Sequence, residues 1–159
     1  MLESDDVVFA GIISSDQPAP MSEIPNRQIV IFDGVCNFCN GSVNFILKRD
    51  PGAVFAFTPR QHRCGQALIQ EFKVPERAAD AILLIKDGRC YLRTDAVLEI
   101  TKDISGLWFL LLVFKIVPRP LRDYFYNLFA GNRYRLFGKR DSCMIPAADV
   151  LSRFIVDEH

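Results

Sequence analysis

The stretch from Ile29 to Cys39 reads Ile-Val-Ile-Phe-Asp-Gly-Val-Cys-Asn-Phe-Cys and predicts how the chain folds. Its first four residues are apolar and predict a buried strand, which Asp33-Gly34 ends with a turn. Apolar residues then recur at helical spacing, so a helix follows directly. Cys36 and Cys39 therefore lie at a helix N-terminus, where unpaired N–H groups and the helix dipole stabilise a thiolate. A strand, a turn and a C-x-x-C at a helix start together predict a dithiol redox site.

Composition limits the class of protein. The chain has 159 residues, half of them apolar, which is enough for one domain with a substantial core and excludes a disordered chain. The formal net charge is zero, so nothing indicates a nucleic-acid partner. Five irregularly spaced cysteines argue against a disulfide-stapled secreted domain. Because the first six residues lack the basic start of a signal peptide, we predict a cytoplasmic protein whose thiols are kept reduced.

The order of predicted elements is β-α-β-α-β-β-α, which is that of a thioredoxin-like α/β fold with a mixed sheet. Strands are predicted at residues 29–32, 54–58, 81–85 and 89–93, and Asp87-Gly88 predicts a hairpin turn between the last two. Helices are predicted at residues 38–49 and 62–72 and from residue 94 onward. We expect a disordered tail at 1–26, the thioredoxin-like domain at 27–103, a helical extension packed on it at 104–146, and a C-terminal helix or tail at 147–159.

The predicted extension begins with residues 107–117, which are apolar apart from Lys115. This run is too short to span a bilayer, which needs ~20 apolar residues. We predict a buried helix, with membrane-surface contact as the alternative. A second helix follows Pro118-Arg119-Pro120, and its apolar stripe is predicted to be core: Leu121, Tyr124, Phe125 and Leu128. A basic cluster after it is predicted to be a solvated face: Arg133, Arg135, Lys139 and Arg140.

Two motifs resemble those of a known family. Asp33, Cys36 and Cys39 form D-x-x-C-x-x-C directly after the first strand, which resembles the DCC family of thiol-disulfide oxidoreductases. The segment Asn-Arg-Tyr-Arg-Leu-Phe-Gly at 132–138, with Cys143 after it, is similar to that family's C-terminal motif. The resemblance covers about residues 29–146. It implies a thioredoxin-like fold and disulfide exchange but supplies no substrate. We predict an enzyme that acts on a disulfide-containing or dithiol substrate, either a protein or a small thiol, without a cofactor. Thioredoxins carry a cis-proline before the third strand, whereas this chain has Asp80 and Ala81 there.

The predicted chemistry divides the work between the two cysteines. Cys36 is expected to attack as the thiolate, and Cys39, expected to be the more buried of the two, resolves the mixed disulfide. Asp33 has two interpretations that can coexist. It can accept N–H bonds from its own turn, or it can take the proton of Cys39 during resolution.

Two alternatives remain open at this point. Cys36 and Cys39 could be half of a zinc site completed by Cys64, Cys143 or His62, but the chain has no second C-x-x-C and no His-x-x-x-His. We therefore predict no bound metal. Cys143 stands beside basic residues and is a candidate third thiol. The other alternative is a thioredoxin-like interaction or redox-sensing module without catalytic activity.

Overall fold

The computed structural model describes residues 27–142 and 148–155. Its centre is a four-stranded mixed sheet with the order β2-β1-β3-β4. The strands are β1 Gln28–Phe32, β2 Phe55–Pro59, β3 Leu83–Lys86 and β4 Arg89–Leu92. β1 pairs parallel with β2 and antiparallel with β3, and β3 pairs antiparallel with β4. The thioredoxin-like α/β fold predicted from the sequence is confirmed.

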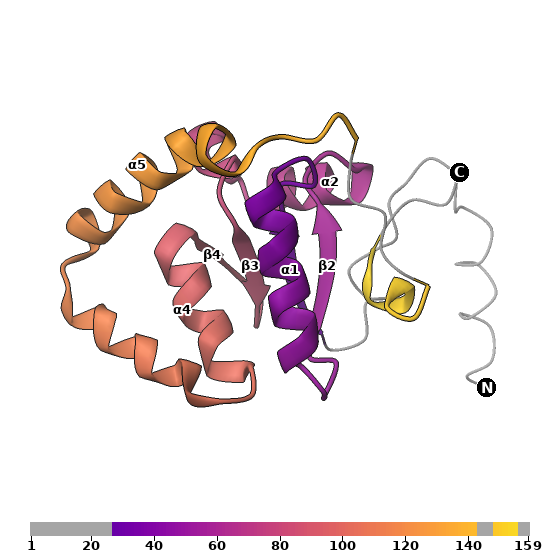
Figure 1. Ribbon diagram of the computed structural model, residues 1–159, viewed down its shortest axis with the longest axis horizontal. Coiled ribbons are helices and arrows are strands. Elements are labelled where there is room, and N and C mark those ends of the chain that lie inside the picture. The colour runs from indigo at the N-terminus through magenta and orange to yellow at the C-terminus, as the bar shows by residue number, and fades with distance from the viewer. Residues whose placement is uncertain (1–26, 143–147, 156–159) are drawn as a thin grey trace, which may run out of the picture.

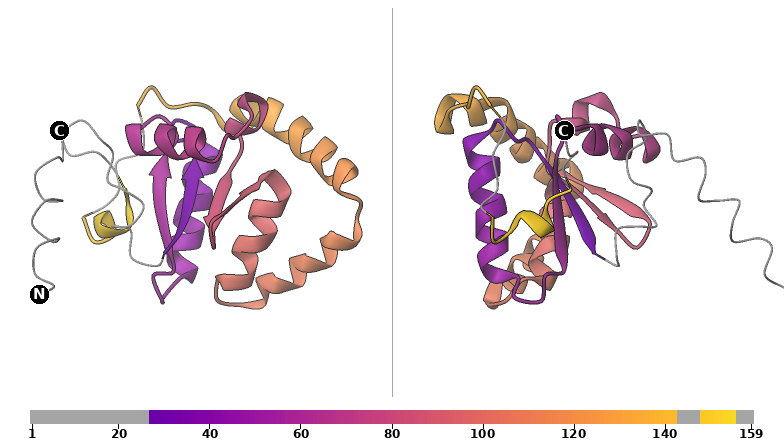
Figure 2. Two further views of the ribbon diagram at one scale, coloured as in Figure 1. Left: turned by 180° about the vertical axis from the view of Figure 1, so that it is seen from behind. Right: turned by 90° about the vertical axis from the view of Figure 1, so that its right-hand side faces the viewer.

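Helices cover both faces of the sheet. They are α1 Asn37–Arg49, α2 Arg63–Glu71, α3 Glu76–Ala79 and α4 Arg93–Asp103. α1 and α4 lie on one face, and α2 and α3 lie on the other (Figure 1 and Figure 2). The short α3 falls between the helix predicted at 62–72 and the strand predicted at 81–85, where we predicted no helix or strand. The remaining helices lie close to their predicted positions.

The apolar core follows the alternation of β1. Val30 and Phe32 point into the cluster beneath α1 and α4, whereas Ile29 and Ile31 point into the cluster beneath α2. Cys64 belongs to the second cluster, so it lies on the opposite face of the sheet from α1.

The β3–β4 hairpin turns at the predicted dipeptide. Asp87 and Gly88 both have positive φ, at 50° and 72°. Two consecutive positive φ values belong to the type I′ turn, whose twist matches that of the flanking strands. Asp87-Gly88 suits this turn because glycine adopts positive φ without steric cost and aspartate tolerates it.

The extension differs from its prediction. It contains η3, a 3₁₀ helix at Leu107–Ile116, and α5 at Arg119–Phe137, which together form an arch around the outside of α4 (Figure 1). We call η3 and α5 the helical arm. η3 has no buried residue, so the predicted buried helix is wrong. The predicted core stripe is also wrong, because all four of its residues are exposed: Leu121, Tyr124, Phe125 and Leu128. No described element lies outside the arm to cover these side chains.

The described C-terminal residues return to the sheet. η4 at Leu151–Arg153 is a short 3₁₀ turn, and the Ile155 N–H donates to the Phe57 carbonyl at 2.8 Å beside β2. Arg153 forms an ion pair with the buried Asp50 at the end of α1. The predicted tail at 1–26 and Cys143 lie outside the described residues, and the predicted domain boundaries stay predictions. No helix within the described residues is long and apolar enough to cross a membrane.

Candidate functional site

Cys36 occupies the N-cap of α1, directly after the turn that ends β1. Its Sγ accepts a hydrogen bond from the Cys39 N–H at 3.4 Å, and the structure has no disulfide between the two cysteines. The N-cap is where the first N–H groups of a helix have no partner within the helix. The sulfur of Cys36 therefore takes the place of the usual capping oxygen, at the positive end of the helix dipole.

The burial of the two cysteines is the reverse of the prediction. Cys36 is 0% exposed, whereas Cys39 is only partly buried. Residues 138–140, which we call the strap, cover the loop that carries Cys36. The Arg140 N–H donates to the Val35 carbonyl at 2.7 Å, and Lys139 forms an isolated antiparallel bridge with Cys36. Backbone pairing with the strap thus accompanies the loss of solvent access at Cys36.

Cys39 lies one turn into α1, and its environment disfavours its thiolate. Burial raises the pKa of the Cys39 thiol well above the ordinary value, and the hydrogen bond with Cys36 raises it further. The positive charge of Arg133 acts in the opposite direction on the same pKa. With the strap in place, Cys39 is therefore a protonated thiol at neutral pH.

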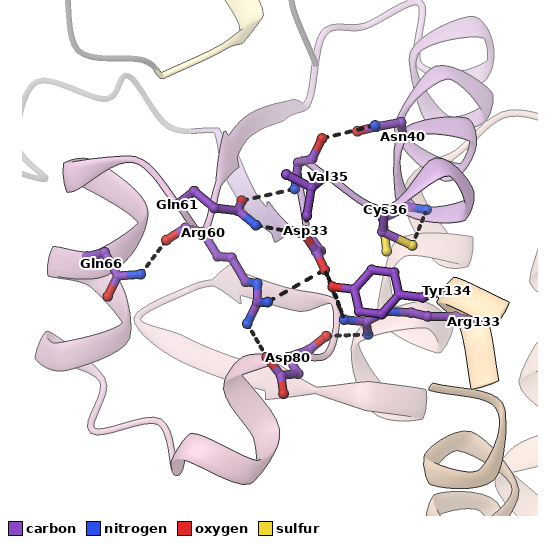
Figure 3. Close-up of polar contacts among 12 residues, drawn as sticks. Asp33, Val35, Cys36, Asn40, Arg60, Gln61, Gln66, Asp80, Arg133 and Tyr134 are labelled. Carbon is purple, nitrogen blue, oxygen red and sulfur yellow. Dashed lines mark hydrogen bonds and ion pairs between the residues drawn. The ribbon is translucent and has the colours of Figure 1, made fainter. Parts of the chain in front are cut away.

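Asp33 is a fully buried carboxylate at the end of β1. Its Oδ1 accepts hydrogen bonds from the Val35 N–H at 3.2 Å and from Gln61 Nε2 at 2.7 Å. The first of these bonds is the predicted turn interaction. Figure 3 shows the carboxylate enclosed by donors from several segments of the chain.

The other carboxylate oxygen of Asp33 contacts three donors. Oδ2 lies 3.0 Å from Arg133 Nη2 and 3.6 Å from Arg60 Nη2, and it accepts a hydrogen bond from the Tyr134 hydroxyl. Burial alone would raise the pKa of Asp33, but hydrogen bonds from Tyr134 and Gln61 and the charge of Arg60 outweigh it and lower that pKa. Asp33 is therefore an ionised and weakly basic carboxylate, which favours the structural interpretation over proton transfer.

The ion pair between Asp33 and Arg133 joins residues 100 positions apart. Arg133 is buried, so its assignment to a solvated face is wrong. Its guanidinium also donates to the Asp80 carbonyl, in the segment that joins α3 to β3 (Figure 3). The two motifs that resemble one family are therefore two halves of one site. The other three basic residues of the predicted cluster are exposed: Arg135, Lys139 and Arg140.

Sequence reasoning missed Arg60, Gln61 and Tyr134 as neighbours of Asp33. Arg60 and Gln61 directly follow β2, and Asp33 directly follows the parallel strand β1. Because the carboxyl ends of neighbouring parallel strands meet at one edge of a sheet, this pairing could have been found from the predicted βαβ unit. The contact with Tyr134 has no such local signal.

A cavity of about 590 Å³ lies beside the dithiol. It is bounded by α1, α4 and the inner side of the helical arm, and Cys39 and Arg133 form part of its wall. The remaining lining is mostly aromatic and aliphatic, including Phe45, Tyr126 and Phe129. The dithiol therefore borders an apolar space rather than a charged one.

The described residues contain no group of three or more His, Cys, Asp or Glu side chains placed to hold a metal ion. His62 is the N-cap of α2, and Cys64 is buried in the core beneath α2. The structure does not bring these two proposed ligands to Cys36 and Cys39 to complete a closed site. Cys143, the third candidate ligand, is outside the described residues.

Comparison with known proteins identifies the family. No solved structure matches the chain. The chain is 41% identical over 133 residues to the uncharacterized protein YuxK of Bacillus subtilis, covering 84% of this chain and 96% of YuxK. It is 37% identical over 123 residues to the chloroplastic DCC family protein At1g52590 of Arabidopsis thaliana, covering 76% of this chain and 71% of that protein. A family model matches residues 30–139, which contain the dithiol, Asp33 and Arg133. The chain belongs to the DCC1-like thiol-disulfide oxidoreductase family.

Proposed function

We propose that this protein exchanges disulfides through Cys36 and Cys39. The Cys36 thiolate attacks one sulfur of a substrate disulfide, the substrate S–S bond breaks, and one substrate thiolate leaves. Cys39 then loses its proton and attacks Cys36 Sγ, which releases the second substrate thiolate and leaves a Cys36–Cys39 disulfide. Two electrons pass from the dithiol to the substrate, and the released thiolates take up the two protons. The reverse sequence oxidises a dithiol substrate.

One observation carries the assignment of roles. Cys36 Sγ sits at the N-cap of α1 with the Cys39 N–H pointing at it, whereas burial raises the pKa of Cys39. Because the thiolate is the nucleophile, this difference supports Cys36 as the attacking thiol and Cys39 as the resolving thiol.

Asp33 and Arg133 are proposed as positioning residues. Asp33 holds Arg133 through an ion pair at 3.0 Å, and the charge of Arg133 opposes the raised pKa of Cys39. Arg133 would therefore favour the Cys39 thiolate that the resolution step needs. In this proposal Asp33 acts through Arg133 rather than by accepting the proton of Cys39.

Attack by Cys36 requires a change at the strap. A sulfur in a fully buried residue has no path to a substrate disulfide, and the strap pairs with the loop through Val35, Cys36 and Asn37. We propose that residues 138–140 move away from α1 to admit substrate. They are held by a few backbone hydrogen bonds, by one from Arg140 Nε to Asn37 Oδ1 at 3.0 Å and by the contact of Lys139 with the Tyr134 ring. Each hydrogen bond has a net contribution of about 1 kcal/mol.

A redox titration tests the proposed exchange. The full-length protein is equilibrated in glutathione buffers, its free thiols are trapped by alkylation, and disulfides are located by peptide mass. We expect a Cys36–Cys39 disulfide with a single midpoint between about −300 and −120 mV. Cys90→Ser, on the β4 edge of the sheet, should leave the midpoint unchanged. Absence of this disulfide across the whole range would refute the proposal.

The cover over Cys36 also supports a second function, a redox-sensing module whose dithiol oxidises without turnover. A coupled assay with glutathione and a disulfide peptide separates the two. An enzyme accelerates reduction of the peptide above the rate with glutathione alone, and Cys36→Ser abolishes the acceleration. A sensor forms the Cys36–Cys39 disulfide but leaves the peptide rate unchanged.

A further inference from the structure

The outer face of the helical arm exposes an unusual number of large apolar side chains. In η3 these are Leu107, Phe109, Leu110, Val113, Phe114 and Ile116, each about half exposed or more. α5 continues the surface with its exposed stripe from Leu121 to Leu128. Soluble monomers rarely expose contiguous apolar patches above a few hundred Å² unless the patch binds something. The outer face of the arm is therefore a candidate binding surface.

The charge of the same region identifies the kind of occupant. Residues 104–142 contain seven basic and two acidic residues, a net charge of +5, so the rest of this neutral chain carries −5. Ion pairs with the domain hold Lys115, Arg119, Arg122 and Arg133. Three further cations are exposed near Leu136 and Phe137, which are exposed as well: Arg135 at the end of α5, and Lys139 and Arg140 in the strap.

We propose that the outer face of the helical arm binds the surface of a bilayer that contains anionic phospholipids, with η3 lying in the interface. An exposed apolar surface with exposed cations at one end is typical of an interfacial segment, and the ten residues of η3 are too few to span a bilayer. Tyr124, which is 63% exposed on α5, adds an aromatic ring that favours the headgroup level. A second copy of the chain is a poorer occupant, because two arms of the same positive charge repel each other.

Docking in this way also places the dithiol close to the membrane. The strap follows α5 directly, and Phe137, at the end of α5, is partly exposed while lining the cavity beside Cys39. The surface binding does not depend on the exchange reaction, because the six exposed side chains of η3 form no part of the cavity beside Cys39.

Vesicle flotation of the full-length protein tests the proposal. The protein is mixed with vesicles of phosphatidylcholine alone or of phosphatidylcholine with phosphatidylglycerol, and the floated protein is quantified for each. We expect flotation with the anionic vesicles, weakened by high salt.

Three variants assign the binding to the arm. Leu110→Gln with Phe114→Gln removes apolar area from exposed positions without changing charge, and should weaken vesicle affinity at least about tenfold. Arg135→Gln should weaken binding to anionic vesicles by about fivefold. Leu151→Gln is the matched control, because Leu151 is 49% exposed but lies in η4 away from the arm. It should float like the wild type, and circular dichroism verifies that all three variants are folded.

Several results would overturn the proposal. Wild-type protein that floats with neither vesicle excludes a membrane surface. Equal flotation of the Leu110→Gln/Phe114→Gln variant, or equal loss in the Leu151→Gln control, excludes the outer face of the arm as the binding surface. Sedimentation in lipid-free buffer tests whether the arm instead binds a second copy of the chain. A wild-type dimer that this double variant converts to monomer, without flotation, would assign the surface to a second copy.

Discussion

β1 and η3 are both runs of almost uninterrupted apolar residues, yet their environments are opposite. From Ile29 to Phe32, every residue of β1 is at most 2% exposed, whereas η3 buries none of its ten residues. β1 has a strand on each edge and helices over each face, while η3 packs along α4 on one side only (Figure 2). An apolar run predicts that a segment will be buried, but the topology decides whether other elements of the same chain lie over it.

The arm and the sheet are also held in different ways. Apolar clusters hold the sheet and its helices together on both faces. The arm is joined to the domain by ion pairs as well as by its inner side chains, and the one buried residue of α5 is the cation Arg133. The stability of the two regions should therefore respond differently to matched substitutions.

The largest expected difference comes from one substitution made in both regions. Phe57→Ala in β2 removes a fully buried ring and should lower the free energy of unfolding by about 3–5 kcal/mol. Phe114→Ala in η3 removes a ring that is more than half exposed and should change it by less than about 0.5 kcal/mol. Urea unfolding measures both. Similar losses for the two variants would mean that the outer face of the arm is buried in solution.

The next effect concerns the ion pair that joins the arm to the dithiol loop. Arg133→Met leaves Asp33 buried with fewer donors and should lower stability by about 3 kcal/mol. We expect a loss of stability near the lower limit for breaking a buried ion pair, because three other side chains still contact the carboxylate: Arg60, Gln61 and Tyr134. Arg135→Met, two positions along and exposed, is the matched control and should change stability by less than about 0.5 kcal/mol.

The pH dependence of the free energy of unfolding tests the contribution of the buried Asp33. The folded-state pKa of Asp33 lies below its unfolded value, so its stabilisation is fully present above about pH 4 and is lost as pH falls through the folded pKa. We expect the free energy of unfolding to fall in this acid range. The fall should be smaller in Asp33→Asn, which has no carboxyl group to titrate there. An identical acid slope in the two proteins would contradict the role given to Asp33.

The smallest effect is expected at the exposed ion pairs of the arm. Arg119 is 64% exposed and pairs with Asp95 at 2.7 Å, so Arg119→Gln should cost less than about 1 kcal/mol. High salt should remove most of that difference, since exposed pairs are screened. A larger, salt-independent loss would show that the arm is anchored at this pair.

The sequence predicts the parts of this molecule that depend on local pattern. The buried strand, the helix that starts at the dithiol and the Asp87-Gly88 hairpin all follow from neighbouring residues. The burial of Arg133 and of Cys36 could not be predicted in the same way. Each depends on a contact about 100 residues away, with Asp33 in one case and the strap in the other. The exposure of η3 was missed because periodicity reports apolar residues but not the absence of a covering layer.

The central claim is that Cys36 attacks and Cys39 resolves, although the structure leaves Cys39 the more accessible thiol. The most direct test incubates Cys36→Ser and Cys39→Ser separately with glutathione disulfide and locates adducts by peptide mass. We predict a stable glutathione adduct on Cys36 in Cys39→Ser, because attack proceeds and resolution is blocked. We predict little adduct on Cys39 in Cys36→Ser, because burial raises its pKa. A stable adduct on Cys39 together with an unmodified Cys36 would contradict the account.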